Sequence, residues 1–227
     1  MSPSSRKGIG LALSGGAARG IAHIAVLEVL ERDDIPIQAI AGTSAGSIVG
    51  ALYAAGMPLT EIKRVILHAK WRDIISLSIP KMGLISSEGI YRFMEDVLPV
   101  KKFSSLPIPL AVVTTDLRSA EKVVLTSGSI ARAVQASCSL PVIFTPTEVN
   151  RRILVDGGVD SLMRGDEEGP GTIIQDAVSL SVVNSLNVPT KILACIGFGA
   201  EADEGEEGAA AAVRGGKRGG RHDRKAS

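Results

Sequence analysis

The stretch IQAIAGTSAGSIVGALYAA, residues 37–55, joins an apolar run to an alanine- and glycine-rich run through Gly42-Thr-Ser-Ala-Gly46. The first run is typical of a buried strand and the second of a helix, so the stretch predicts a strand that turns sharply into a helix. A serine at such a turn projects its hydroxyl from the sheet edge at the helix N-terminus, and flanking glycines permit the strained backbone. Ser44 is therefore the candidate nucleophile of a hydrolase.

Strand-like and helix-like segments alternate on both sides of this turn. Strands are predicted at 8–13, 37–41, 110–115, 122–126, 151–155 and 191–196, and helices at 21–33, 45–55, 59–69, 87–98, 129–137 and 172–186. This alternation predicts a three-layer α/β/α fold with a mostly parallel central sheet. Residues 71–80 (WRDIISLSIP) are apolar and irregular, and we interpret them as a cap over the site.

The composition favours one folded domain. A chain of 227 residues with 45% apolar content can bury a sizeable core. We predict an N-terminal extension at 1–7, an α/β hydrolase domain at 8–198 and a disordered low-complexity tail at 199–227, where alanine, glycine, arginine and lysine dominate.

Charge and cysteine content limit the partners and the compartment. The formal net charge of +1 gives no general electrostatic reason to expect nucleic acid as a partner. Cys138 and Cys195 lie in apolar surroundings without metal-ligand spacing, which favours reduced thiols and a cytoplasmic location. No signal-peptide pattern and no membrane-spanning apolar run is present. Peripheral contact with a membrane stays open, through residues 71–80 or Ile143-Phe144, although such stretches are more often core.

A glycine-rich turn follows the first predicted strand. Ser14-Gly-Gly-Ala-Ala-Arg-Gly20 opens a helix, so its amides lie at the positive end of the helix dipole. Gly15, Gly16 and Ala17 are the candidate oxyanion hole, because acyl transfer to a serine needs N–H donors beside the nucleophile. A nucleotide phosphate loop is the weaker reading, since neither G-x-G-x-x-G spacing nor a P-loop lysine is present. Arg19 either positions this loop or an anionic substrate group, or forms a structural salt bridge.

A nucleophilic Ser44 also needs a base that accepts its proton. A Ser-acid-His triad requires a histidine well downstream of the serine, but His68 lies late in a predicted helix and His222 in the tail. His23 lies upstream and reads as a packed helical residue. Asp156 ends the strand 151–155 and precedes Gly157-Gly158, where a partly desolvated carboxylate can accept a serine proton directly. A lone Asp-Gly-Gly is usually a β-turn, but here the serine turn and the glycine loop accompany it.

These three elements together resemble the patatin-like phospholipase family. LALSGGAARGIAHIAVLEVLE resembles the family's oxyanion loop and first helix, AGTSAGS its nucleophile turn, and VDGGV its aspartate motif. The segment TTDLRSAEKVVLTSGSIARAVQASCSLPVIFTP, with Asp116, Ser137, Pro141 and Phe144, resembles the part between serine and aspartate, so the resemblance covers residues 8–158. It implies a patatin-like fold, a Ser44–Asp156 dyad without histidine, an oxyanion hole around Gly15 and Gly16, and hydrolysis of acyl-lipid esters without a metal or other cofactor.

Two departures from the family pattern stand out. Ser14 takes the place of the first of three glycines, and its amide can still donate a hydrogen bond. Residues 159–204 depart more strongly and resemble part of an unrelated, uncharacterised prokaryotic family. Within them Asp166, Glu167 and Glu168 are adjacent acids of the kind found in solvated loops, and no histidine or cysteine accompanies them as a metal ligand.

The sequence thus predicts a serine-dependent hydrolase that cleaves carboxylic esters of acyl lipids, a phospholipase or esterase. A soluble short-chain esterase or thioesterase would share every motif. A catalytically impaired scaffold that binds lipid or a partner protein is the alternative that is not an enzyme.

Overall fold

The computed structural model describes residues 8–16, 20–69, 85–159 and 191–195. The predicted cap at 71–80, the predicted helix at 172–186 and both terminal extensions lie outside these residues. The same holds for the acidic loop at 166–168.

The described chain is built around a single β-sheet of seven strands. Its strands are β1 (Ile9–Leu13), β2 (Ile37–Thr43), β3 (Leu110–Asp116), β4 (Lys122–Leu125), β5 (Thr147–Val149), β6 (Arg152–Asp156) and β7 (Lys191–Cys195). The order is β5-β6-β3-β2-β1-β7, with β4 also paired to β3. Strands β7, β1, β2 and β3 run parallel and form the centre, whereas β4, β5 and β6 add antiparallel pairs. The predicted α/β fold with a mostly parallel central sheet is confirmed.

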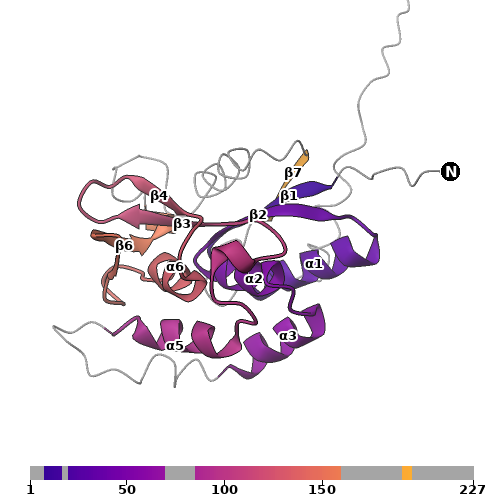
Figure 1. The fold of residues 1–227 in the computed structure, drawn as a ribbon, viewed down its shortest axis with the longest axis horizontal. Helices are drawn as coiled ribbons and strands as arrows, with labels where there is room; N and C mark the ends of the chain where they lie inside the picture. The colour runs from indigo at the N-terminus through magenta and orange to yellow at the C-terminus, as the bar shows by residue number, and fades with distance from the viewer. Residues whose placement is uncertain (1–7, 17–19, 70–84, 160–190, 196–227) are drawn as a thin grey trace, which may run out of the picture.

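The described helices lie on one side of this sheet (Figure 1). They are α1 (Ala22–Arg32), α2 (Ala45–Ala54), α3 (Leu59–His68), α5 (Glu88–Val97) and α6 (Ile130–Ser137), with short 3₁₀ turns at Phe103–Ser105 and Gly157–Val159. Helices α1, α2 and α6 lie next to the strands, and α3 and α5 lie beyond them (Figure 1). The third layer of the predicted three-layer arrangement stays a prediction.

Local sequence explains where these helices begin and what they bury. The Ser129 hydroxyl accepts a hydrogen bond from the Arg132 amide at 3.2 Å, so it caps α6 as a serine at this position is expected to do. Apolar side chains at helical spacing on α1, α2 and α6 pack against the strands. The largest fully buried apolar side chains of this core include Leu11, Leu13, Leu27, Ile40, Leu52, Ile130 and Leu154.

The pairing of β3 positions the ends of two other strands. Thr43 at the end of β2 pairs with Val113, and Asp156 at the end of β6 pairs with Thr114. Because β4 pairs along the same part of β3 and occupies its other edge, β2 and β6 must share one edge. They run in opposite directions, so their carboxyl ends meet head to head at adjacent β3 residues.

Candidate active site

Ser44 lies directly after β2 and immediately before α2, where the sequence predicts the turn. Its backbone angles are φ 50° and ψ −124°, a region that residues with a side chain rarely adopt. Such a conformation costs roughly 1–3 kcal/mol and persists only where surrounding contacts hold it. The strained turn leaves the Ser44 side chain half-buried at the carboxyl end of the sheet.

Several hydrogen bonds hold this turn. The Ser44 amide donates to the Ser137 hydroxyl oxygen at 2.9 Å. The Ser44 carbonyl oxygen accepts from the Ser47 amide at 2.9 Å and from the Ser47 hydroxyl at 2.6 Å. A methyl group built on Gly46 would lie 2.5 Å from the Ser14 carbonyl oxygen, so only glycine lets α2 approach the loop after β1 this closely. The backbone of the candidate nucleophile is therefore fixed on both sides.

Asp156 ends β6 and is 5% exposed. Its carboxylate accepts a hydrogen bond from the Gly158 amide at 2.8 Å, and the neighbouring Ser44 side chain lowers its pKa by hydrogen bonding. Its own amide donates to the Ser139 carbonyl oxygen at 3.0 Å. The structure thus brings together Ser44 and Asp156, the two residues that the sequence singles out as nucleophile and base.

The pKa of Asp156 reflects its buried position. Burial disfavours the charged carboxylate and raises its pKa from 3.8 to about 6, while the hydrogen bonds from Ser44 and Gly158 oppose this rise. A carboxylate with such a pKa is largely ionised at neutral pH and still basic enough to accept a proton. This combination suits a general base.

The glycine loop leads from the end of β1 toward Ser44. Gly15 is buried and Gly16 is half-buried, both directly after β1, while Ala17 and Arg19 lie outside the described residues. The contact of Gly46 with the Ser14 carbonyl places this loop against the start of α2. The position fits a loop that donates amides to an oxyanion beside Ser44, and that role stays a prediction.

Both described histidines lie on helices and contact backbone carbonyl oxygens. His23 is fully buried, and its Nε2 donates to the Ser14 carbonyl oxygen at 2.9 Å. Burial lowers its pKa, so its imidazole is neutral and supports the loop after β1. His68 is exposed on α3, where its Nδ1 lies 2.9 Å from the Arg64 carbonyl oxygen. Both positions agree with the sequence-based interpretation of these residues.

Cys138 is a free, buried cysteine that follows α6. Burial and the nearby Asp156 charge both raise the pKa of its thiol. The thiol is therefore protonated at neutral pH and a poor nucleophile. It behaves as the small buried apolar residue that the sequence predicts.

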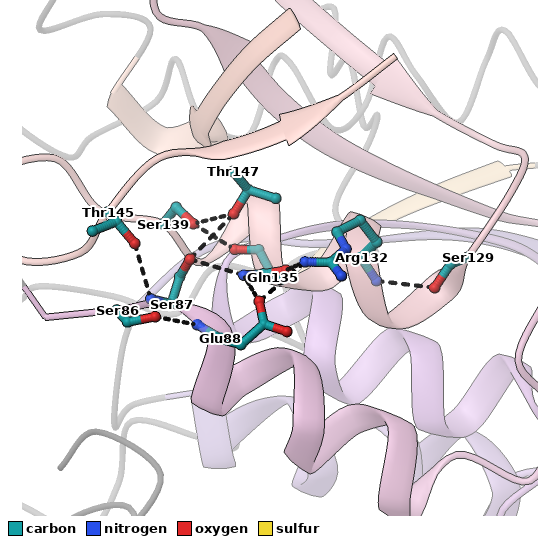
Figure 2. A network of polar contacts seen from close by, with 9 residues as sticks. All are labelled: Ser86, Ser87, Glu88, Ser129, Arg132, Gln135, Ser139, Thr145 and Thr147. Carbon is teal, nitrogen blue, oxygen red and sulfur yellow. Dashed lines mark hydrogen bonds and ion pairs between the residues drawn. The ribbon is translucent and has the colours of Figure 1, made fainter. Parts of the chain in front are cut away.

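A network of polar side chains beside the site is not evident from sequence motifs (Figure 2). The buried Gln135 amide of α6 donates to the Ser87 hydroxyl at 2.9 Å, and the Ser139 hydroxyl lies 2.9 Å from that of Thr147. The Glu88 carboxylate forms an ion pair with the Arg132 guanidinium, with 3.2 Å between nitrogen and oxygen. The signal in the sequence is weak: polar residues occur at 135 and 137 at the end of the alanine-rich helix α6 and at 139 just after it.

Two further observations concern metals and membranes. Within the described ranges, no group of three or more His, Cys, Asp or Glu side chains could hold a metal ion. Among the same residues, no helix is long and apolar enough to cross a bilayer.

The fold and the site define an α/β protein whose sharp strand-to-helix turn carries a serine beside a buried aspartate. A family model described as patatin-like phospholipase matches residues 11–161. The chain therefore belongs to the patatin-like phospholipase family. The matched region includes the last part of β1, the Ser44 turn and Asp156.

The chain is also similar to several known proteins. An uncharacterized NTE family protein of Mycobacterium tuberculosis is 36% identical over 182 residues, which cover 78% of this chain and 50% of that protein. Lysophospholipase NTE1 of Yarrowia lipolytica is 30% identical over 187 residues, covering 79% of this chain and 13% of the relative. The chain thus spans half or less of these relatives' length. The crystal structure of VipD from Legionella pneumophila is 18% identical with a TM-score of 0.49, covering 69% of this chain and 47% of that one.

Proposed function

We propose that the protein hydrolyses carboxylic esters of acyl lipids through a Ser44–Asp156 dyad. The observation that supports this most is the junction of β2 and β6 on β3, which brings the Ser44 turn close enough to the buried Asp156 carboxylate for Ser44 to lower its pKa by hydrogen bonding. The name of the Yarrowia lipolytica relative, a lysophospholipase, supports an acyl lipid as the substrate class.

The reaction proceeds in two steps. Asp156 accepts the Ser44 proton as Oγ bonds to the ester carbonyl carbon, and the tetrahedral intermediate collapses as the protonated Asp156 returns its proton to the departing alcohol. Water then attacks the acyl-enzyme, giving its proton to Asp156, and the released Ser44 oxygen takes that proton as the fatty acid leaves. The Gly15 and Gly16 amides, with Ala17, stabilise the negative oxygen in both steps. Arg19 positions this loop or an anionic group of the substrate.

A chain-length series tests the substrate class. We expect kcat/KM on p-nitrophenyl esters to rise from acetyl toward long acyl chains and lysophosphatidylcholine to release its fatty acid, because an acyl-lipid hydrolase gains transition-state binding from the chain. A preference for acetyl or for thioesters would instead assign a short-chain esterase or thioesterase. No hydrolysis of any ester by a folded protein would assign a binding scaffold.

We also propose peripheral contact with a lipid surface, through the loop that follows α6. Val142 is 87% exposed and lies at a φ of 72°, while Leu140 and Ile143 are 39% and 45% exposed. The loop begins directly after Ser139, whose carbonyl oxygen accepts a hydrogen bond from the Asp156 amide. Phe144, by contrast, packs against the core and does not take part. Exposed apolar side chains grouped beside a site favour an apolar surface as partner.

Flotation with phosphatidylcholine vesicles tests this contact. We expect the Val142→Asp, Ile143→Asp double variant to lose most of the vesicle-bound fraction, because two charges in the acyl region are costly. Leu67→Asp is the matched control, since Leu67 is 53% exposed on α3, away from the site. Equal recovery of wild type and double variant with the vesicles would contradict the contact.

A further inference from the structure

The hydroxyl of Ser137 connects the Ser44 turn to the sheet. Ser137 is the last residue of α6 and is fully buried. Its oxygen accepts a hydrogen bond from the Ser44 amide at 2.9 Å and donates its own proton to the Val113 carbonyl oxygen of β3 at 2.6 Å. One hydroxyl thus joins three elements that are far apart in the sequence.

This bridge lies where the ladder between β2 and β3 stops. The last paired residues are Thr43 and Val113, and the chain turns away from β3 at Ser44. A buried amide and a buried carbonyl at such a break each need a partner. The Ser137 hydroxyl satisfies both, in the way that a ladder hydrogen bond would if β2 continued.

The other half of the dyad is held two residues further along the same segment. The Ser139 carbonyl oxygen accepts the Asp156 amide at 3.0 Å. The Ser139 hydroxyl donates to the Gln135 carbonyl at 2.8 Å and lies 2.9 Å from the Thr147 hydroxyl of β5. Through Ser87, which contacts both Gln135 and Thr147, the start of α5 joins the same network (Figure 2).

We propose that the segment Ser137–Ser139 is a positioning element that fixes the distance and angle between the Ser44 hydroxyl and the Asp156 carboxylate. Ser137 is the positioning residue on the nucleophile side, and the Ser139 backbone acts on the aspartate side. This inference rests on the proposed dyad and adds to it a group that touches neither the substrate nor the transferred proton.

The chemistry explains why this positioning matters. Proton transfer from Ser44 to Asp156 requires a heavy-atom separation within hydrogen-bond reach. A misplacement of about 1 Å can cost about 10²-fold in rate. Removing the Ser137 hydroxyl leaves the strained Ser44 turn without its amide acceptor, so the Ser44 side chain samples positions away from Asp156. Substrate binding does not use Ser137, and KM should change little.

The test is steady-state hydrolysis of a p-nitrophenyl ester by Ser137→Ala. We expect kcat to fall about 10- to 100-fold with KM within about twofold. In the pH profile of kcat, the fall on the acid side should move to higher pH. The hydrogen bond from Ser44 lowers the pKa of Asp156, so weakening that bond raises this pKa. The positioning role is overturned if kcat stays within about twofold of wild type and the fall on the acid side does not move.

A control separates positioning from loss of stability. Ile62→Val, fully buried on α3, destabilises the fold without touching the dyad. An equal loss of kcat in this variant at equal melting temperature would also overturn the inference. If Ser137→Ala does not fold, Ser137→Cys replaces it, with the same expectation of a lower kcat and an unchanged KM. A wild-type protein that hydrolyses no ester would refute the proposed function instead, so the two failures are distinguishable.

Discussion

Asp156→Asn will abolish ester hydrolysis and will raise the stability of the fold at alkaline pH. Asparagine cannot accept the Ser44 proton, so kcat/KM should fall about 10³- to 10⁴-fold. It is nearly the same size as aspartate, its oxygen can still accept the Gly158 amide, and it carries no charge to bury. The same change thus removes activity and removes a cost of folding.

The stability effect has a definite sign and pH window. Asp156 is an acid whose folded pKa is raised from 3.8 to about 6, so the native state binds its proton more tightly than the unfolded chain does. Between pH 4 and 6 the stability of the wild type therefore falls as pH rises, and above about pH 6 the full cost of the buried charge is present. At about 1.4 kcal/mol per pH unit this cost reaches at most about 3 kcal/mol.

Thermal melts of wild type and Asp156→Asn at pH 4 and pH 8 measure this effect. The variant should melt higher at pH 8 and at about the wild-type temperature at pH 4. The wild-type kcat/KM should itself fall to half at about pH 6, where Asp156 becomes protonated. A variant that melts lower at pH 8, or that keeps hydrolysing esters, would contradict the role of this carboxylate.

Ser44→Gly and Ser44→Ala will both be inactive, and the glycine variant will be the more stable of the two. Either change removes the proposed nucleophile and should cost at least about 10³-fold in kcat/KM. The φ of 50° and ψ of −124° at this position strain alanine as they strain serine, whereas glycine adopts them without a clash.

The expected difference follows from two opposing contributions. Relief of backbone strain stabilises Ser44→Gly relative to Ser44→Ala by roughly 1–3 kcal/mol. The greater conformational freedom of glycine in the unfolded chain destabilises it by about 0.5–1 kcal/mol. The net gain of Ser44→Gly over Ser44→Ala is therefore about 1 kcal/mol in the free energy of unfolding, measured by denaturant titration. Equal stability of the two variants would mean that the Ser44 turn is not strained.

Many helices and strands of this fold can be predicted from local sequence patterns. The predicted strand and helix on either side of Ser44 correspond to β2 and α2, because apolar runs and glycine turns act over a few residues. The helix predicted at 87–98 is observed as Glu88–Val97 for the same reason. Strand β5, only three residues long, was missed, since it exists through its pairing with β6 and not through its own pattern.

The candidate site likewise has residues that local motifs predict and one that they do not. Ser44 and Asp156 can be inferred because each lies in a short motif with a chemical reason for its residue types. The proposed role of Ser137 cannot be inferred in this way. It depends on long-range pairing, in which β6 pairs with the same edge of β3 as β2, beyond the point where β2 ends. That junction brings residues 44, 113 and 137 together, and no local pattern encodes such a long-range contact.

Fluorophosphonate labelling at pH 8, with the modified peptide identified by mass spectrometry, tests the Ser44–Asp156 dyad most directly. The reagent bonds covalently only to an activated serine, so it reports on the nucleophile without any assumption about the lipid substrate. We predict a label on Ser44 in the wild type and a labelling rate reduced at least about 100-fold in folded Asp156→Asn. A label on another serine, or an undiminished rate in Asp156→Asn, would contradict the dyad.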